Sequence, residues 1–433
     1  MKSHHFFCGA MRKIAQEIYF FLGKRRLQKK MKLRVPTYYK EFRCIADKCK
    51  DSCCIGWEID IDEDTFDYYN SVSGEFGKRL KENMKSGEEN CFRLKHGRCP
   101  FLNQKNLCDI CIELGEEALS EVCTEYPRFT MEYGDVVEKC MALSCEEVGR
   151  LLFQSTEPFA YEEMEQEACY DVMWEEDDTG EASEEEEPEE DYIAAVEAAR
   201  ESVFHILAMR EISIELRLAE CLHLCEQMQD KVNEGQYYEV IQLASRYDLL
   251  MEKFADRKNE ESDNQETIDS KEAENRFHQQ MKARMNCYGQ LEVLDEEWRH
   301  TFRHVKEVLL DGKLSMPEYA SCYQEYINED REREYEQLID YFIFRYFMRA
   351  VYDYNMMDKM KFAALSFLCL RDLDLVRFLD QGKSYAVNDR IDLSRIYSKE
   401  VEHSEENVEA LNEMLEFEPE LELEQMIQAI RLI

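Results

Sequence analysis

The feature that most constrains this sequence is the stretch between Arg43 and Arg150, which holds 11 of the 18 cysteines in the chain. Thiolates are soft ligands that suit zinc ions and iron–sulfur clusters, and such a centre needs several of them brought together from short turns. The spacing therefore predicts a metal or iron–sulfur module. The cysteines of the stretch are Cys44, Cys49, Cys53, Cys54, Cys91, Cys99, Cys108, Cys111, Cys123, Cys140 and Cys145.

A disulfide framework is the first alternative, but such frameworks belong to small secreted domains in oxidising compartments. This chain has 433 residues, and Lys24, Arg25 and Arg26 follow its first apolar run instead of preceding it, which is not the order of a secretory signal. The neighbouring thiols of Cys53 and Cys54 could bond to each other only with strain. Metal or cluster ligation is favoured, and free thiols and redox disulfides stay open alternatives.

The composition favours helices over sheets, because the chain has only 15 glycines and 7 prolines beside abundant Glu, Leu, Lys and Met. Neither G-x-G-x-x-G nor G-x4-G-K-[ST], the usual marks of dinucleotide and phosphate sites, occurs. We expect a mainly α fold in which an N-terminal cysteine-rich metal or Fe–S module precedes an all-helical domain.

The domain boundaries follow from shifts in composition. Between Trp174 and Asp191 the sequence has 12 acidic residues of 18 and no basic one, and a run of this kind is solvated and repels itself. The expected segments are a basic N-terminal extension (residues 1–30), the cysteine-cluster domain (31–150), an acidic linker (151–191) and the helical domain (192–433).

The N-terminal extension is open to two interpretations. Its apolar residues fit one helical face with Lys and Arg opposite, which is typical of a helix lying on a membrane surface. Alternatively, translation begins at Met31 and the extension is an artefact of start assignment. No segment is long and apolar enough to span a bilayer. The sequence predicts a cytoplasmic protein and leaves peripheral membrane association through residues 1–30 open.

Two local predictions concern the cysteine-cluster domain. Asp62 or Asp64 is expected to cap a helix. A second helix, over Ile112–Arg128, would carry Cys123 toward the metal and end at Tyr126, before a proline.

The net charge of −40 excludes general nucleic-acid binding, because phosphate contacts are made by an excess of Lys and Arg. An acidic face could attract a lysine-rich protein and speed its encounter. The alternative is that the charge only keeps a helical protein in solution.

The cysteine pattern carries a resemblance to a known family. The chain contains Cys44-x4-Cys49-x3-Cys53-Cys54, followed by Cys99-Pro-Phe-Leu, Cys108-Asp-Ile, Cys123-x2-Tyr-Pro-Arg and Leu143-Ser-Cys145-Glu. This pattern resembles the flagellin lysine-N-methylase (FliB) family and, more distantly, zinc- or iron-chelating cysteine-cluster domains. The resemblance covers about residues 31–150 and continues more weakly in FIFRYFMRAVYD and YSKEVEHSEEN.

The resemblance implies S-adenosylmethionine-dependent methylation of lysine amines on flagellin or another lysine-rich protein, with a [4Fe–4S] cluster held by cysteines; zinc is the alternative metal. One cluster takes four thiolates, so either a second metal is present or several cysteines are structural. Cys49, Cys53, Cys54 and Cys123 are the first candidates. The cysteines that match motif positions are Cys44, Cys49, Cys53, Cys54, Cys99, Cys108, Cys123 and Cys145.

The chain departs from the C-x3-C-x2-C run of radical S-adenosylmethionine enzymes, because Gly56 occupies the third position. Radical transfer is thereby in doubt, and polar attack by a neutral amine is the simpler chemistry. The missing glycine-rich fingerprint also disfavours the common Rossmann methyltransferase core.

Candidate catalytic residues lie in the last motif. A lysine amine has a solution pKa of about 10.4 and must be neutral to attack, so a nearby side chain should accept or relay its proton. Tyr397, Glu402 and His403 are the candidates, with helix packing and surface charge as the alternatives.

Two arginines are candidate cofactor contacts. Arg345, in the apolar segment Tyr335–Leu370, either pairs with a buried acid or holds the carboxylate of S-adenosylmethionine. Arg128 is a substrate or cofactor contact, or it forms a structural ion pair. The whole enzyme hypothesis has an alternative of another class, a non-enzymatic zinc or iron scaffold whose helical domain binds a partner protein.

Overall fold

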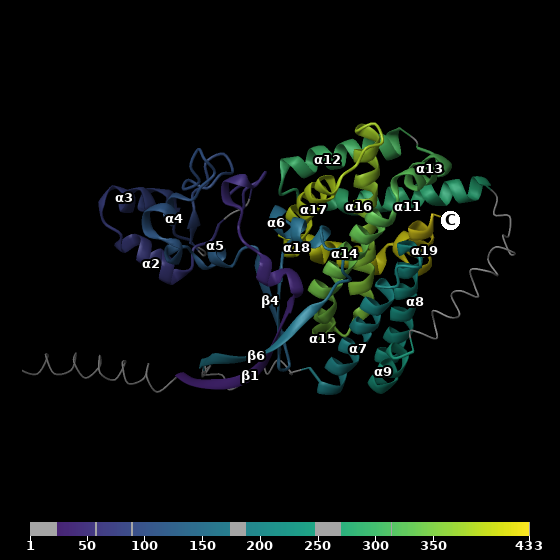
Figure 1. Cartoon of the computed structure of the whole chain (residues 1–433), viewed down its shortest axis with the longest axis horizontal. Coiled ribbons are helices and arrows are strands. Elements are labelled where there is room, and N and C mark those ends of the chain that lie inside the picture. The colour runs from purple at the N-terminus through teal and green to yellow at the C-terminus, as the bar shows by residue number, and fades with distance from the viewer. Residues whose placement is uncertain are drawn as a thin grey trace, which may run out of the picture.

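The computed structural model describes residues 24–56, 59–87, 90–173, 188–246, 270–312 and 314–432. A cysteine-bearing lobe with short helices lies beside a larger body of long helices, and a β-sheet runs along the body below the lobe (Figure 1). We call the described residues between Cys54 and Cys123 the small lobe. The helical body comprises the described residues from 188 to 432 together with the sheet and helix α6 that pack on them.

The sheet has four strands in the order β4-β5-β1-β6. β1 is antiparallel to β6 along its whole length, and it is parallel to β5 only at Lys32–Arg34. Met31 and Val35 are buried while Lys30 and Lys32 are exposed, so β1 has the alternation of a half-buried strand. The strands are β1 (Lys24–Pro36), β4 (Arg128–Tyr133), β5 (Val136–Met141) and β6 (Tyr161–Met173).

This sheet was not predicted. β1 crosses the expected boundary at Met31, since residues 24–30 are part of the strand. β6 occupies residues 161–173 of the expected linker. The membrane-surface helix expected before residue 23 and the acidic run at residues 174–187 lie outside the described residues.

The small lobe has its own apolar core, which includes Tyr69, Leu80, Phe92 and Phe101. Asp62 caps α2 as predicted, because its Oδ1 accepts from the amide of Thr65 at 2.9 Å. The elements are α2 (Glu63–Ser71), α3 (Gly74–Asn83), β2 (Met84–Lys85), β3 (Cys91–Phe92), α4 (Asp109–Leu114), η3 (Glu116–Ala118) and α5 (Glu121–Glu125), preceded by η1 (Thr37–Glu41) and η2 (Ala46–Lys48).

The single helix predicted for Ile112–Arg128 is wrong. α4 ends at Gly115, whose φ of +97° lies in a region that residues with a Cβ rarely adopt. The chain then turns through η3 before α5 begins, and Cys123 lies within α5. The end of the helix before Pro127 is as predicted.

The helical body is organised around α16, which packs against α8, α14 and α17 (Figure 1). Gly235, whose φ is +70°, separates α8 from α9. The elements are α6 (Glu146–Phe153), α7 (Glu190–Leu207), α8 (Ile214–Asn233), α9 (Tyr237–Ala244), α11 (Ser270–Gln290), α12 (Glu296–Lys306), η4 (Glu307–Asp311), α13 (Met316–Tyr326), α14 (Glu329–Tyr346), η5 (Phe347–Arg349), α15 (Ala350–Asp353), α16 (Met356–Asp380), α17 (Val387–Val401), α18 (Glu405–Phe417), η6 (Pro419–Leu421) and α19 (Leu423–Arg431).

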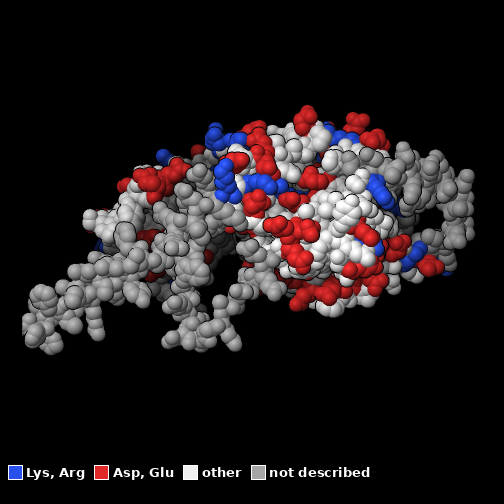
Figure 2. Space-filling model, turned by 90° about the horizontal axis from the view of Figure 1, so that it is seen from below, with Lys and Arg blue, Asp and Glu red and all other residues white. Residues whose placement is uncertain are grey.

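The mainly helical fold predicted from composition is confirmed. No helix within the described ranges is long and apolar enough to cross a bilayer. Acidic side chains spread over the face of the body seen from below, and basic side chains gather in a few places (Figure 2).

Candidate functional site

Four of the eight motif cysteines lie together in the small lobe, with Cys99 in its apolar core and Cys54, Cys108 and Cys123 packed against that core. The amide of Cys99 donates to the carbonyl of Cys54 at 2.8 Å, and Cys108 is bridged to Leu102 just beyond Cys99. Cys123 packs against the same core from α5. Backbone pairing and core packing therefore bring four thiols from distant parts of the sequence into one region.

The electrostatics of these four thiols agree with that placement. Burial, and then the charges of Cys54, Cys123 and Cys108, raise the pKa of Cys99 to about 12. Burial, and then Cys54 and Cys108, raise the pKa of Cys123 to about 11. The neighbouring thiols thus disfavour ionisation of Cys99 and Cys123, which is the situation that a bound cation reverses. Cys54 differs, because a hydrogen bond with the side chain of Cys53 lowers its pKa to about 7.

The other four motif cysteines lie where the small lobe meets the helical body. Burial, then Glu146 and Cys145, raise the pKa of Cys49 to about 12. Cys145 is the N-cap residue of α6 and interacts with Cys44, which in turn interacts with Cys53. Outside the motif, Cys91 and Cys140 are buried and Cys111 is exposed.

Within the described ranges, no group of three or more His, Cys, Asp or Glu side chains has the arrangement of a metal site. The chemistry of the donor set still suits a soft metal or an iron–sulfur cluster, because thiols are the side chains gathered here. Which of them bind metal therefore stays a prediction.

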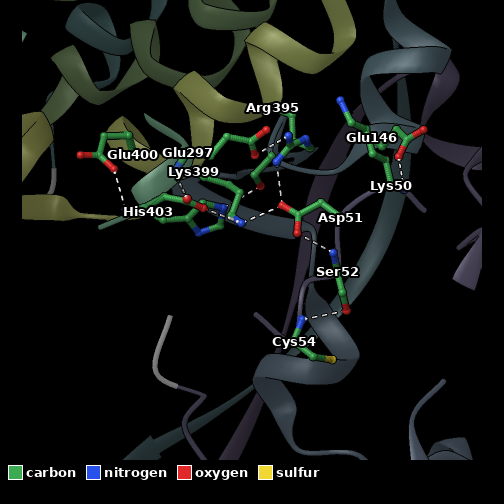
Figure 3. Close-up of polar contacts among 12 residues, drawn as sticks. Lys50, Asp51, Ser52, Cys54, Glu146, Glu297, Arg395, Lys399, Glu400 and His403 are labelled. Atoms are coloured by element: carbon green, nitrogen blue, oxygen red, sulfur yellow. Dashed lines mark hydrogen bonds and ion pairs between the residues drawn. The ribbon is translucent and has the colours of Figure 1, made fainter. Parts of the chain in front are cut away.

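We call residues 44–54, which carry Cys44, Cys49, Cys53 and Cys54, the cysteine loop. Ion pairs hold this loop against α17 (Figure 3). Oδ2 of Asp51, which lies between Cys49 and Cys53, accepts from Nη1 of Arg395 at 2.7 Å. The same oxygen accepts from Nζ of Lys399, also at 2.7 Å. The loop that supplies motif cysteines is therefore fixed to the helix that leads to the last motif.

Glu402 is the C-cap residue of α17, and its carboxylate is fully buried. Its Oε2 lies 2.6 Å from Nη1 of Arg345 and accepts from the hydroxyls of Tyr341 at 2.8 Å and Tyr346 at 3.0 Å. The guanidinium of Arg345 also lies 3.9 Å from the ring centroid of Phe129 on β4. The acidic partner expected for Arg345 is thus Glu402, and the pair fixes the end of α17.

His403 follows Glu402, and its side chain is exposed on one side. Its Nε2 is 2.6 Å from Oγ of Ser144, and its ring stacks on that of Tyr126 at 6.0 Å. The hydroxyl of Tyr126 lies 3.1 Å from the same Oγ. His403 thus contacts Tyr126, which lies three residues after Cys123, and Ser144, which directly precedes Cys145.

The charge state of His403 follows from its surroundings. Partial burial, and then the positive charges of Arg345 and Lys399, lower the pKa of His403 to about 4. The ring is therefore neutral at pH 7 and able to accept a proton.

Tyr397 lies deeper in the helical body than His403. Its hydroxyl is 2.8 Å from Oγ of Ser366 and 3.1 Å from the hydroxyl of Tyr288, and the residue is 1% exposed. The structure therefore places His403 against Tyr126 and Ser144, keeps Glu402 buried against α14, and places Tyr397 in the core of the helical body.

Arg128 opens β4 and lies over two rings, at 5.3 Å from the centroid of Phe42 and 5.8 Å from that of Tyr39. Arg128 was expected to form an ion pair or to contact a ligand. The contacts that the structure shows for it are these cation–π interactions.

Three residues of the site were missed in the sequence. Asp51 lies between two motif cysteines, Ser144 directly precedes Cys145, and Tyr126 lies within the Cys123-x2-Tyr-Pro-Arg motif. Their position inside the motifs is the signal that could have identified them.

Comparisons with known proteins agree with the resemblance noted in the sequence. A family model described as the FliB lysine N-methylase C-terminal domain matches residues 200–429, more than half of the chain. Glu402 and His403 lie in the matched part.

Relatives from Salmonella are similar over shorter stretches. The lysine-N-methylase of Salmonella typhimurium is 28% identical over 143 residues, which are 31% of this chain and 36% of that protein. The flagellar biosynthetic protein FliU of Salmonella muenchen is 30% identical over 128 residues, 28% of this chain and 76% of that protein. The chain thus spans about a third of the length of the lysine-N-methylase it matches.

No solved structure matches the chain. The family match covers the long helices of the body from residue 200 onward and the end of α17, where Glu402 and His403 lie. This chain therefore belongs to the FliB lysine N-methylase family.

Proposed function

We propose that this protein is a lysine N-methyltransferase that modifies a protein substrate. The observation that carries the proposal is the match of residues 200–429 to the C-terminal domain of the FliB lysine N-methylases. Within that region, His403 offers a neutral imidazole with one side open to solvent. The resemblance implies S-adenosylmethionine as methyl donor and flagellin as substrate, and the names of the relatives point to lysine methylation and to flagellar biosynthesis.

The chemistry requires a neutral amine, because a protonated lysine has no free electron pair to attack with. S-adenosylmethionine, when bound, supplies a methyl group on a positively charged sulfur. The attacking nitrogen must lose one proton, and we assign its acceptance to His403. Because the pKa of His403 is about 4, the ring passes the proton on to solvent instead of retaining it.

Neighbouring side chains hold His403 for this role. Ser144 and Tyr126 fix its ring. The Arg345–Glu402 pair anchors the residue before it. Glu402 is fully buried and bound to a guanidinium and two phenols, so we assign it a positioning role in place of a catalytic one.

We propose Cys54, Cys99, Cys108 and Cys123 as the ligands of a [4Fe–4S] cluster, with zinc as the alternative metal. This assignment keeps two of the four cysteines first considered and replaces the other two. Cys49 lies toward the helical body, and Cys53 is exposed and does not pack on the small-lobe core, although its side chain hydrogen-bonds that of Cys54. A cluster there would cross-link the small-lobe core and lower the pKa of its thiols.

The site for S-adenosylmethionine is not defined by the two arginines considered for it. Arg345 would have to give up Glu402 to bind a second carboxylate, and Arg128 lies over the rings of Tyr39 and Phe42. Their cofactor roles stay predictions.

The test is methyl transfer to flagellin by protein purified without oxygen, with labelled S-adenosylmethionine and mass spectrometry of the modified lysines. His403→Gln should lower the rate by about 10²-fold or more if the imidazole accepts the proton. His300→Gln, which changes an exposed histidine on α12, should keep the native rate.

Absence of methyl transfer in protein that retains its metal would overturn the proposal. The chain would then be a metal-binding scaffold whose helical body binds a partner. Equal losses in His403→Gln and His300→Gln would overturn the role of His403 alone.

A further inference from the structure

One carboxylate joins the cysteine loop to the end of α17. Oδ1 of Asp51 accepts from the amide of Ser52 at 2.8 Å, and Oγ of Ser52 accepts from the amide of Cys54 at 3.3 Å. The other oxygen, Oδ2, binds Arg395 and Lys399. Asp51 therefore shapes the turn that carries Cys53 and Cys54 and at the same time binds the helix (Figure 3).

We propose that Asp51 is a positioning residue whose ion pairs with Arg395 and Lys399 fix the cysteine loop relative to His403. The proposal rests on the proposed function, because it concerns the placement of the group that would accept the lysine proton. It does not depend on which metal the thiols bind.

Burial makes these ion pairs strong enough to hold the loop. The side chains of Arg395, Lys399 and Asp51 are 2%, 13% and 21% exposed. Ion pairs at such sites are screened little by salt, whereas fully exposed pairs contribute little. A second contact supports the same docking, since Nζ of Lys50 lies 2.6 Å from Oδ1 of Asp392 on α17.

The position of α17 is transmitted directly to His403. Lys399 precedes His403 by four residues, about one helical turn, and the amide of Glu402 donates to the carbonyl of Ser398 at 2.9 Å. On its other side His403 contacts Ser144, which is next to Cys145. The imidazole is thus held between the end of α17, to which Asp51 is bound, and the segment that carries Ser144 and Cys145.

The network allows Asp51 to be changed without leaving a buried cation unpaired. Lys399 keeps Asp295 at 2.9 Å, and Arg395 keeps Glu297 at 2.8 Å and Asp392 at 3.0 Å. Asp51→Asn should therefore fold. The substitution removes only the negative charge that the cysteine loop contributes to the ion pairs with Arg395 and Lys399.

The experiment compares Asp51→Asn and Asp51→Glu with Asp47→Asn, which changes an exposed acid of the same loop. Hydrogen exchange is followed in residues 46–56 and 399–404, together with iron and sulfide content and methyl-transfer kinetics. Asp51→Asn should keep the native iron and sulfide content and exchange faster in both segments. Its kcat should fall by about 10-fold or more with little change in KM for the protein substrate.

Controls and rescue separate this role from a general loss of stability. Asp47→Asn should match the native protein in every measurement. Asp51→Glu, which keeps the charge on a longer arm, should recover part of the exchange protection and part of kcat.

Three outcomes would overturn the proposal. They are native exchange at residues 399–404 in Asp51→Asn, the same exchange change in Asp47→Asn, or loss of the metal of the native protein in Asp51→Asn. A different result would separate the two proposals. If the native protein transferred no methyl group but Asp51→Asn exchanged faster in both segments, the proposed function would be overturned and the docking role of Asp51 would stand.

Discussion

The small lobe and the helical body bury their cysteines in different ways. Cys221, Cys225 and Cys369 of the body are fully buried among long helices, where a thiol acts as a small apolar group. Cys54, Cys108 and Cys123 of the small lobe are half-buried at the rim of a modest core. The difference teaches that the number of cysteines does not by itself identify metal ligands. The position of a thiol relative to the apolar core separates the cysteines proposed as ligands from those that only fill the helical body.

The two regions also differ in how they are stabilised. The body has a continuous core that runs from the sheet to α19. The small lobe is built from short helices and two two-residue strands, and a domain of that size is marginal without a metal or cross-links. Metal binding should therefore decide whether the lobe folds and leave the body folded.

The largest expected effect comes from removing one of the proposed metal ligands of the small lobe. Cys99→Ser should lose metal, and hydrogen exchange across residues 59–123 should approach that of an unfolded peptide while α14 and α16 stay protected. The reason is that the lobe core loses the cross-link between its thiols.

The control for that experiment is Cys111→Ser, because Cys111 is an exposed lobe cysteine outside the motif. It should keep native metal content and exchange. If Cys99→Ser kept a protected lobe, the comparison between the two regions would fail.

The next effect concerns the body side of the junction. Glu402→Gln leaves the guanidinium of Arg345 buried without its carboxylate, which should lower the free energy of unfolding of the body by about 3–5 kcal/mol. Denaturant titration followed by circular dichroism measures it. Glu325→Gln, at an exposed pair with Lys383, should change stability by less than about 1 kcal/mol. Similar values for the two variants would refute the buried role of Glu402.

Matched truncations in the two cores sharpen the comparison. Leu80→Ala in the small lobe and Leu365→Ala in α16 each remove a fully buried side chain, and each should cost about 2–5 kcal/mol. Because the lobe has less stability to lose, Leu80→Ala should abolish lobe protection, whereas Leu365→Ala should only lower the denaturation midpoint of the body. Hydrogen exchange resolved by segment distinguishes them, and a protected lobe in Leu80→Ala would contradict the expected weakness.

The sequence predicted the helical class, the cap at Asp62 and the helix end before Pro127, because these depend on local composition and spacing. It did not predict the four-stranded sheet, since β1 is paired with β5 and β6 from more than a hundred residues away. The prediction of one helix over Ile112–Arg128 was wrong because it relied on the apolar spacing and did not consider Gly115, whose positive φ ends α4.

The same division holds for the site. Arg345 was expected to need an acid, and Glu402 and His403 were singled out by motif, yet nothing local in the sequence indicates that Glu402 is that acid. Asp51 and Ser144 were missed because their partners lie on α17 and at His403, hundreds of residues away. Contacts of this kind become visible only when the lobe and the body are placed side by side.

The smallest expected effect is a pH dependence specific to the body. Burial raises the pKa of Glu400 to about 7, although its Oε2 accepts from the amides of Leu294 and Asp295. The folded state therefore holds this proton more tightly than the unfolded state, in which the pKa is near the ordinary 4.5. The stability contributed by Glu400 is present below about pH 4.5 and is lost as the pH rises to about 7.

Glu400→Gln imitates the protonated carboxyl, so it should match the native protein near pH 4.5. It should become more stable than the native protein above pH 7, on the order of 1–3 kcal/mol. Urea titrations of both proteins between pH 4.5 and 8 measure the difference, and Glu413→Gln on the exposed side of α18 controls for the loss of one negative charge. If the two variants gave the same pH profile, the effect would come from net charge and not from the buried carboxyl. A profile unique to Glu400→Gln, with unchanged lobe exchange, would show that the body titrates independently of the small lobe.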